Sequence, residues 1–405
     1  MEAGNIAFIM ICTAMVFLMT PALAFFYGGL ERRKNILNTM MMSIGTMGLA
    51  SIIWIAVGYS LSFSGDGSFV GNLNHIFFQG VSMTKGDGIP EGLFALFQMM
   101  FSLITAAILT GSVVGRMRFP AILLFLAFWL VIVYAPMAHM VWGGGLIASL
   151  GAIDFAGGTV VHISSGISGL ILCIVLGQRR EFKQAEYRPH NIPFVVLGMG
   201  LLWFGWFGFN AGSALAADGL AIQAFLTTNT AASAGMLSWM LVERMSTGKP
   251  TVVGACTGAV VGLVAITPGA GFVSIWASIV IGALVSPFCY YSISIIKQKF
   301  GFDDSLDAFG CHGMGGIFGS IVTGIFADPA VNGSAGLLYG GFDLFWAQIE
   351  ATVITIVFAG VASLVIIYIV KAIMPIRVSA KNEALGLDHS EHSENAYPTF
   401  VGLDS

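Results

Sequence analysis

Charged residues are scarce in this chain. Only 9% of its 405 residues are Asp, Glu, Lys or Arg, whereas a soluble protein carries about a quarter of its residues in these four types. So few charges cannot cover a surface of this size in water, and most of the surface must therefore face lipid. The net charge of −4 is small, which argues against a nucleic-acid or polyanionic partner.

Paired cysteines are also missing. The five cysteines lie singly in apolar segments, and no Cys-x-x-Cys motif occurs. An isolated cysteine in such a segment behaves as a small hydrophobic residue. We therefore interpret all five as core residues and predict no cofactor.

Long apolar runs are what the chain does contain. A helix needs about 20 mostly apolar residues to cross about 30 Å of hydrocarbon. Eleven segments meet this requirement, near residues 5–30, 36–63, 92–114, 119–141, 157–177, 192–215, 220–243, 251–268, 273–296, 304–327 and 345–373. Glu2 stands where a signal peptide carries positive charge, so we expect the first helix to remain in the mature protein.

The distribution of positive charge predicts the orientation. All but one of the 17 Lys and Arg residues fall in one set of loops, and only Lys85 lies in the other set. Cationic loops stay in the cytoplasm, and an odd number of spans separates the termini. The N-terminus is therefore predicted outside and the C-terminus inside.

Two segments repeat at an offset of 150 residues. "VHISSGISGL" (161–170) and "CHGMGGIFGS" (311–320) each carry a histidine, His162 and His312, with an aspartate eight residues earlier, Asp154 and Asp304. Five spans separate the two segments, so the second half enters the membrane with opposite polarity, and such inverted repeats place a substrate site at their interface. The predicted fold is an all-α integral membrane protein with an inverted five-plus-five helix repeat (about 1–180 and 190–330) and one additional helix.

The histidine pair is a candidate pore element. Small residues three, four and seven positions after each histidine let helices approach closely, so we expect His162 and His312 to lie side by side, with one ring nitrogen hydrogen-bonded to the other ring. Ionisable groups at membrane depth usually face a pathway, although a lone histidine is equally well a hydrogen-bonded core residue. A metal site is less suitable, because Asp154 and Asp304 lie about 12 Å away along their helices.

Aromatic residues gather near the predicted outer ends of three spans. They are Phe97 and Phe101, Trp206 and Phe209 with Ser213 after them, and Trp142. Such residues are common as an aromatic belt. Ring faces with a hydroxyl group also suit a small cation, by cation–π attraction and hydrogen bonding.

Several longer motifs resemble the signature segments of the ammonium transporter family (Amt/Mep/Rh), on its Amt branch. They are "DFAGGTVVH" (154–162), "WFGFNAGSA" (206–214) and "DDSLDAFGCHGMGG" (303–316), with "FFYGGLERRKN" (25–35) and "GLDHSEHSENAY" (386–397) similar as well. The resemblance covers nearly the whole chain. It implies eleven transmembrane helices, a homotrimer with one pore in each subunit, a multi-pass place in the cell (inner or plasma) membrane, and no enzymatic activity.

The resemblance also implies a role for individual residues. The outer recruitment site comprises Phe97, Phe101, Trp142 and Ser213, with Asp154 as electrostatic support. The pore and gate comprise Phe101, Phe209, Trp206, His162, His312, Phe26 and Tyr27. Burying an intact ammonium ion costs on the order of 20 kcal/mol, so ammonium (or its analogue methylammonium) is expected to bind outside, lose its proton and pass as ammonia, with the proton following separately.

Three alternatives to this reading are an ammonium sensor on the same fold, a passive ammonia channel of the Rh type, and a membrane metalloenzyme using the two histidines. About 30 residues follow the last span, too few for the signalling domain of a sensor, and Trp142 and Ser213 favour cation recruitment over passive conduction. We divide the chain into a transmembrane domain (1–376) and a cytoplasmic regulatory tail (377–405). The tail is acidic and is predicted to dock on the cytoplasmic face. The resemblance implies a PII-type signalling protein as its partner.

Overall fold

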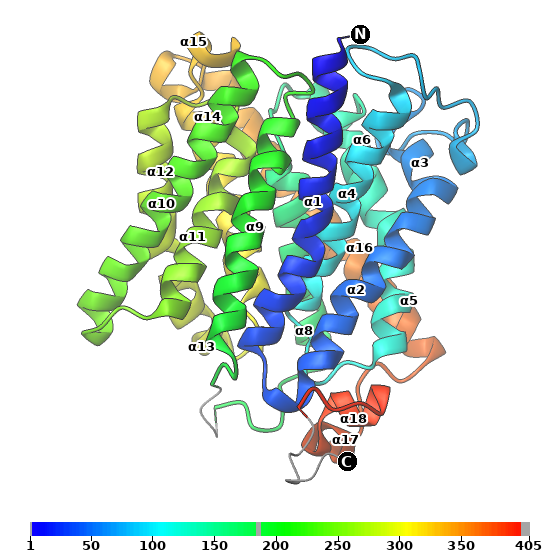
Figure 1. Cartoon of the computed structure of the whole chain (residues 1–405), viewed down its shortest axis with the longest axis vertical. Helices are drawn as coiled ribbons and strands as arrows, with labels where there is room; N and C mark the ends of the chain where they lie inside the picture. The colour runs from blue at the N-terminus through cyan, green and yellow to red at the C-terminus, as the bar shows by residue number, and fades with distance from the viewer. Residues whose placement is uncertain (1, 184–187, 398–405) are drawn as a thin grey trace, which may run out of the picture.

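The computed structural model describes residues 2–183 and 188–397. Within these ranges the secondary structure is helical, and the extended pairing consists of two isolated bridges. The long helices run side by side as one bundle, with the N-terminus at one end and the C-terminal tail at the other (Figure 1). We call these the N-terminal end and the tail end of the bundle.

Nine helical segments in the described ranges are long and apolar enough to cross a membrane. They are Ala3–Leu30 (α1), Arg33–Phe63 (with α2 at Ile36–Ile53 and α3 at Tyr59–Phe63), Glu91–Thr110 (α4), Phe119–Ser149 (with α5 at Phe119–Trp129 and α6 at Ala135–Trp142), Gly158–Leu176 (η5 at Gly158–Ile163, then α8 at Ser164–Leu176), Ile192–Gly212 (α9), Ile275–Phe300 (with α12 at Ile275–Tyr291 and α13 at Lys297–Phe300), Phe309–Phe326 (η8 at Phe309–Gly313, then α14 at Met314–Phe326) and Phe342–Ile373 (α16). This confirms a multi-pass membrane protein.

Two further helices occupy the remaining predicted segments. α10 (Gly219–Thr247) is less apolar than the nine, and α11 (Val252–Ile266) is shorter. They pack against each other, and α10 also packs against α12. Each of the eleven apolar segments of the sequence therefore coincides with a helix of the bundle.

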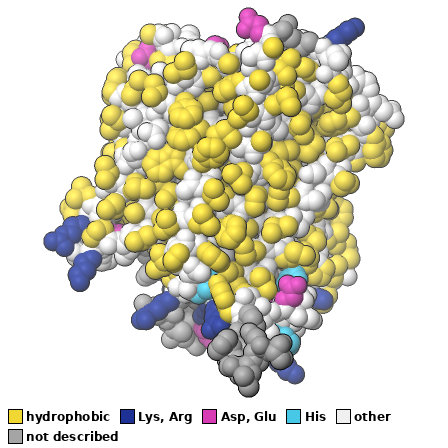
Figure 2. All heavy atoms as spheres, viewed as in Figure 1, with side chains coloured by type: hydrophobic (Ala, Val, Ile, Leu, Met, Phe, Trp, Pro, Cys, Tyr) yellow, Lys and Arg dark blue, Asp and Glu magenta, His cyan; other side chains and the backbone are white. Residues whose placement is uncertain are grey.

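The surface of the bundle is apolar around its middle. Figure 2 shows hydrophobic side chains covering the centre of one face, with charged side chains at its two ends. On α10, Ile222 and Leu237 are both about two-thirds exposed, at 65% and 66%. Large apolar side chains are stable in such exposed positions when the surrounding solvent is lipid.

The two histidine-bearing helices begin in the same unusual way. η5 and η8 are π-helical, and each is preceded by an aspartate whose carboxylate accepts hydrogen bonds from the first N–H groups of the helix. These N–H groups have no partner within the helix itself. Asp154 and Asp304 are therefore N-terminal caps, and both are buried or partly buried.

Glycine lets these two helices meet. A Cβ atom at Gly166 of α8 would lie 2.2 Å from the backbone nitrogen of Gly313, and one at Gly316 of α14 would lie 3.0 Å from Cβ of His162. A larger residue at Gly166 would push the helices apart. The small positions after each histidine thus bring the two histidine-bearing helices into contact, as small residues do in membrane bundles.

The tail folds back onto the tail end of the bundle. Arg377 pairs with Met117 in a short antiparallel bridge, and α17 (Ala380–Leu385) and α18 (Leu387–His392) follow it. Oδ1 of Asp388 accepts from the N–H of Asn38 in the first turn of α2, at 2.9 Å. Glu391 accepts from the N–H of Phe119 at the start of α5, at 3.0 Å. Residues 398–405, the end of the predicted tail, lie outside the described residues.

Candidate functional site

A cluster of aromatic rings lies toward the N-terminal end of the bundle. The Phe101 ring contacts Phe97 edge-on at a centroid distance of 5.0 Å and Trp142 at 5.9 Å. On its other side Phe101 stacks on Phe209, at 4.2 Å and an interplanar angle of 29°. Phe97 and Phe101 come from α4, Trp142 ends α6 and Phe209 lies on α9. Residues of three helices thus form one aromatic cluster.

A carbonyl group and a hydroxyl group contact members of this cluster. The indole Nε1 of Trp142 donates to the backbone oxygen of Asp154 at 2.9 Å, which fixes the ring. Ser213 follows α9, and its hydroxyl donates to the Phe209 carbonyl at 2.9 Å. Because the hydroxyl hydrogen is used there, the Ser213 oxygen retains lone pairs that can accept from a cation.

The carboxylate of Asp154 faces the start of η5. It accepts from the N–H groups of Gly157, Gly158 and Thr159 and from the Thr159 hydroxyl. Burial raises the pKa of Asp154, although the hydrogen bonds from Thr159 and the two glycines oppose this effect. Asp154 therefore contacts the aromatic cluster through its backbone oxygen, which accepts from Trp142, and its side chain is bonded to η5.

The two histidines lie on the far side of the stacked phenylalanines. The His162 ring is 6.3 Å from Phe209 and stacks on Trp206 at 5.4 Å. Nδ1 of His162 and Nδ1 of His312 are 3.2 Å apart, so the expected ring-to-ring hydrogen bond is confirmed. Thr267 accepts from the Trp206 indole at 2.9 Å and holds that ring in place.

The facing Nδ1 atoms determine how the two neutral rings can be protonated. One Nδ1 must carry the hydrogen and the other must accept it, so the second ring carries its proton on Nε2. One of the two Nε2 atoms is then an acceptor and the other a donor. Nε2 of His162 is buried and has no hydrogen-bond partner among the described residues.

A narrow cavity runs along the histidine pair. Aliphatic side chains line it together with Phe26, Trp206, Phe209 and the two histidines. Its volume is about 10 Å³, which is room for about one water molecule. The cavity therefore fits a small neutral molecule and not a hydrated ion.

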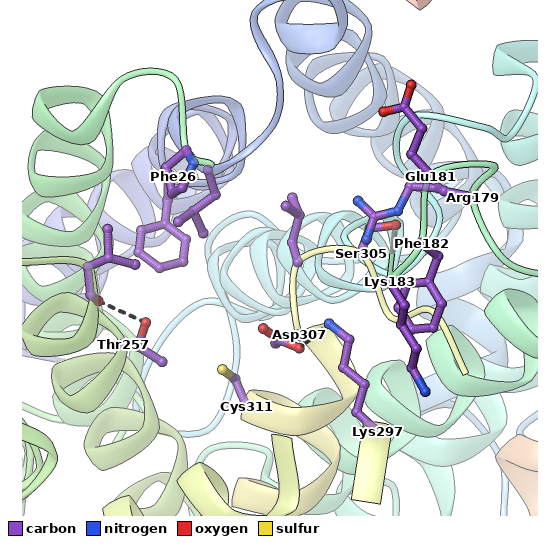
Figure 3. A pocket seen from close by; sticks show the side chains of 14 residues that line it. Phe26, Arg179, Glu181, Phe182, Lys183, Thr257, Lys297, Ser305, Asp307 and Cys311 are labelled. Atoms are coloured by element: carbon purple, nitrogen blue, oxygen red, sulfur yellow. Dashed lines mark hydrogen bonds and ion pairs between the residues drawn. The ribbon is translucent and has the colours of Figure 1, made fainter. Parts of the chain in front are cut away.

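A wider cavity of about 350 Å³ follows toward the tail end (Figure 3). Phe26 lines both cavities. Cys311, next to His312, and the ion pair of Lys297 with Asp307 also line the wide cavity. Tyr27 lines neither cavity, and its hydroxyl donates to the Ile108 carbonyl inside the bundle at 2.9 Å.

A buried ion pair braces the chain beside the wide cavity. The Asp303 carboxylate accepts from the backbone N–H, Nε and Nη2 of Arg179, at 2.5–2.8 Å, and its carbonyl accepts from Arg116. Burial raises the pKa of Asp303, but the hydrogen bonds and charge of Arg179 outweigh it, and the pKa lies below its ordinary value. Thr267, Lys297 and this pair were not predicted, because only their distant partners make them notable.

The arrangement offers no metal centre in the part of the chain that the structure describes. No group of three or more His, Cys, Asp or Glu side chains lies close enough there to hold a metal ion. The histidine pair has aromatic and aliphatic neighbours instead. The pair offers ring nitrogens that donate and accept hydrogen bonds.

Comparison with known proteins agrees with this geometry. Residues 7–397 match the model of the Ammonium Transporter Family. The chain is 50% identical over 402 residues to an ammonium transporter of Bacillus subtilis, covering 98% of this chain and 99% of that protein. It is 45% identical over 399 residues to ammonium transporter Amt1 of Archaeoglobus fulgidus, covering 98% and 100%.

Two solved structures are similar over nearly the whole chain. The crystal structure of Saccharomyces cerevisiae Mep2 matches with a TM-score of 0.89 and 34% identity, covering 94% of this chain and 90% of that chain. A structure named Sensor Amt Protein matches with a TM-score of 0.89 and 26% identity, covering 96% and 98%.

Proposed function

Because this chain belongs to the ammonium transporter family, we propose that it carries ammonium across the cell membrane by binding the ion outside and conducting ammonia through its own pore. One observation carries the proposal. Phe101 of the aromatic cluster stacks on Phe209, and Phe209 lines a narrow cavity together with two hydrogen-bonded histidines.

The aromatic cluster around Phe101 is the proposed recruitment site. An ammonium ion resting on the Trp142 and Phe101 ring faces gains cation–π attraction, worth about 0.5–2 kcal/mol. The Ser213 oxygen, held toward the same region by its bond to Phe209, accepts one N–H of the ion. Phe97 supports the Phe101 ring, and Asp154 supports Trp142.

At the stacked Phe101 and Phe209 rings, ammonium loses its proton and continues as ammonia. Moving the intact ion into the narrow cavity would cost on the order of 20 kcal/mol, whereas ammonia is neutral. Inside, the donor and acceptor Nε2 atoms of His162 and His312 match the lone pair and the N–H groups of ammonia. The shared Nδ1 hydrogen bond gives the proton a route of its own, so uptake is electrogenic. Phe26 is the second constriction, and Tyr27 shapes the pore wall from behind.

The proposed architecture follows from the same features. All eleven segments cross the membrane, α10 and α11 included, with the N-terminal end outside and the tail in the cytoplasm. The Asp-capped, histidine-bearing helices support an inverted repeat of residues 1–180 and 190–330, within a transmembrane domain of residues 1–376. Three subunits form a homotrimer in the cell membrane.

The tail is the proposed regulatory element of residues 377–405. Its carboxylates accept hydrogen bonds from the N–H groups at the starts of α2 and α5. Docking of the tail therefore depends on the positions of these two transmembrane helices. Each contact is individually weak, and a cytoplasmic protein of the PII type that binds the tail or its docking surface can displace it. This displacement would change the transport rate.

A second candidate function is ammonium sensing, favoured by the likeness to the structure named Sensor Amt Protein. The test that separates the two functions is current on solid-supported membranes that carry the reconstituted full chain. We expect ammonium pulses to give a current, methylammonium a smaller one and potassium none. A sensor gives no transport current, and a passive ammonia channel of the Rh type makes the vesicle interior alkaline without current. Either result contradicts the proposal.

A further inference from the structure

Lys297 and Trp142 make the same kind of contact with the two capping aspartates. Trp142 donates its indole N–H to the carbonyl oxygen of Asp154. Lys297 donates from Nζ to the carbonyl oxygen of Asp304, the matching aspartate of the second half, at 2.6 Å. The carbonyl oxygen of one capping aspartate thus accepts from an aromatic ring, and that of the other accepts from an ammonium group.

The Lys297 ammonium group is bound as a free ammonium ion would be. Besides the Asp304 oxygen, it contacts Oδ1 of Asp307 at 2.7 Å. A carbonyl and a carboxylate oxygen form the kind of acceptor set that binds an N⁺–H group most strongly. Asp307 adopts a left-handed backbone conformation (φ 57°), which is uncommon for a residue other than glycine and turns its carboxylate toward the lysine.

This ion pair stands at the inner mouth of the proposed path. Figure 3 shows the Lys297 side chain reaching across the wide cavity to Asp307, with Cys311 beside them. Cys311 precedes His312, so the pair lies close to the place where ammonia leaves the histidines. Both side chains are partly accessible, at 18% for Lys297 and 33% for Asp307, and a cation entering from this side reaches them.

We propose that Lys297 is a resident ammonium group that fills a cation site at the inner end and thereby prevents free ammonium from binding there. This inference rests on the proposed transport of ammonium inward. With Lys297 in place, ammonia leaves as a neutral molecule and ammonium formed inside finds no vacant site on the exit. Without it, the Asp307 carboxylate and the Asp304 carbonyl oxygen bind ammonium from the inside and obstruct the path.

The test uses the reconstituted full chain in liposomes, with the tail facing the lumen in a known fraction of molecules, as measured by protease access. Initial uptake of labelled methylammonium is measured at increasing lumenal ammonium. In Lys297→Met we expect half-inhibition at a lumenal concentration at least 3-fold lower than in the wild type. Lumenal ammonium lowers the driving force for uptake equally in every variant, so the variants are compared at equal ammonium gradients. Lys299→Met, which removes a neighbouring lysine of α13, is the matched control and should behave like the wild type.

The acceptor side gives the second arm. In the double variant Lys297→Met, Asp307→Asn the carboxylate is gone, and half-inhibition should return to the wild-type concentration. If Lys297→Met does not fold, Lys297→Gln, which keeps an amide donor for Asp304, replaces it and should show the same direction. Unchanged inhibition in the measured Lys297 variant, or a shift that persists without the Asp307 carboxylate, overturns the inference. Absence of any uptake by the wild type contradicts the proposed function instead.

Discussion

Replacing Asp154 by asparagine tests the part of the site on which both the gate and the histidine depend. Oδ1 of Asp154 accepts from Gly157 N at 2.8 Å and Gly158 N at 2.7 Å, and Oδ2 accepts from Thr159 N at 2.8 Å and from its hydroxyl. Asparagine offers one oxygen, and its amide nitrogen would face two donors. The change therefore removes two hydrogen bonds to a charged group at the start of η5.

The magnitude follows from that count. A hydrogen bond to a charged group contributes about 1.5–3 kcal/mol, so two of them amount to roughly 3–6 kcal/mol before compensation. Asparagine also avoids the cost of burying a carboxylate, the same cost that raises the Asp154 pKa. We expect a net loss of stability of about 2 kcal/mol. Because Trp142 is bonded to the Asp154 carbonyl, we also expect a higher half-saturating ammonium concentration.

The assay is thermal unfolding of the purified protein in detergent, followed by currents on solid-supported membranes. Asp218→Asn is the matched control, because one oxygen of Asp218 alone accepts both of its capping bonds, from Leu220 N and Ala221 N. Asparagine and aspartate are nearly equal caps in that geometry, so this variant should differ from the wild type by less than about 0.5 kcal/mol. Equal unfolding midpoints for the two variants would refute the reasoning.

Three other changes probe the pore, its bracing and the tail. His162→Ala or His312→Ala breaks the ring-to-ring bond and should abolish proton-coupled current in protein that still assembles; full currents in both variants remove the pair from the mechanism. Asp303→Asn breaks a buried pair with Arg179 and should cost about 3–5 kcal/mol, seen as a lower unfolding midpoint at pH 7. Because the Asp303 pKa is lowered, its stabilisation is complete above about 3.9, the value of a free carboxyl, and is lost as pH falls through the lower folded value. Truncation after Ser379 removes α17 and α18 and should slow transport, whereas equal rates in the same liposomes show that the tail is not needed.

The bundle was predictable because apolar length is a property of a single segment. A run of about 20 apolar residues can satisfy its backbone in lipid only as a helix, whatever its neighbours are. The π-helical starts η5 and η8 had no such signal. Their hydrogen-bond pattern depends on the Asp154 and Asp304 caps and on the close approach at Gly166, and the apolar pattern of each segment reads as an ordinary helix.

Contacts between distant segments were predictable only where the repeat supplied a second copy. The offset of 150 residues placed His162 against His312, and the structure confirms that pair. Thr267 and Lys297 gave no local signal, because their significance comes from Trp206 and Asp307 on other elements. Each residue alone reads as an ordinary end of an apolar helix.

The tail lies on the tail end of the bundle, but the contacts that hold it there differ from those that its acidic composition indicates. Its acidic composition predicted attraction to basic loops. In the structure Asp388 and Glu391 instead accept backbone N–H groups at the starts of two transmembrane helices, where the helix dipole also favours negative charge. Burial raises the pKa of Asp388, so this residue's contribution to docking is greatest at low pH and declines as pH rises through the raised value. Net charge alone did not contain that geometry.

Selection for ammonium and rejection of potassium occur at different places along the proposed path. In the proposed mechanism the aromatic cluster attracts any small cation, because cation–π attraction depends on charge rather than on hydrogen bonding. The cavity beyond Phe209 has room for about one water-sized molecule and offers the His162 and His312 nitrogens as its polar groups. In the proposed mechanism potassium, which cannot lose its charge, meets the full cost of burial there. Ammonium leaves its proton behind and enters as ammonia, with a lone pair and three N–H groups. Substitutions that open the aromatic cluster should therefore change the affinity for ammonium. Only substitutions at the histidines should let potassium through.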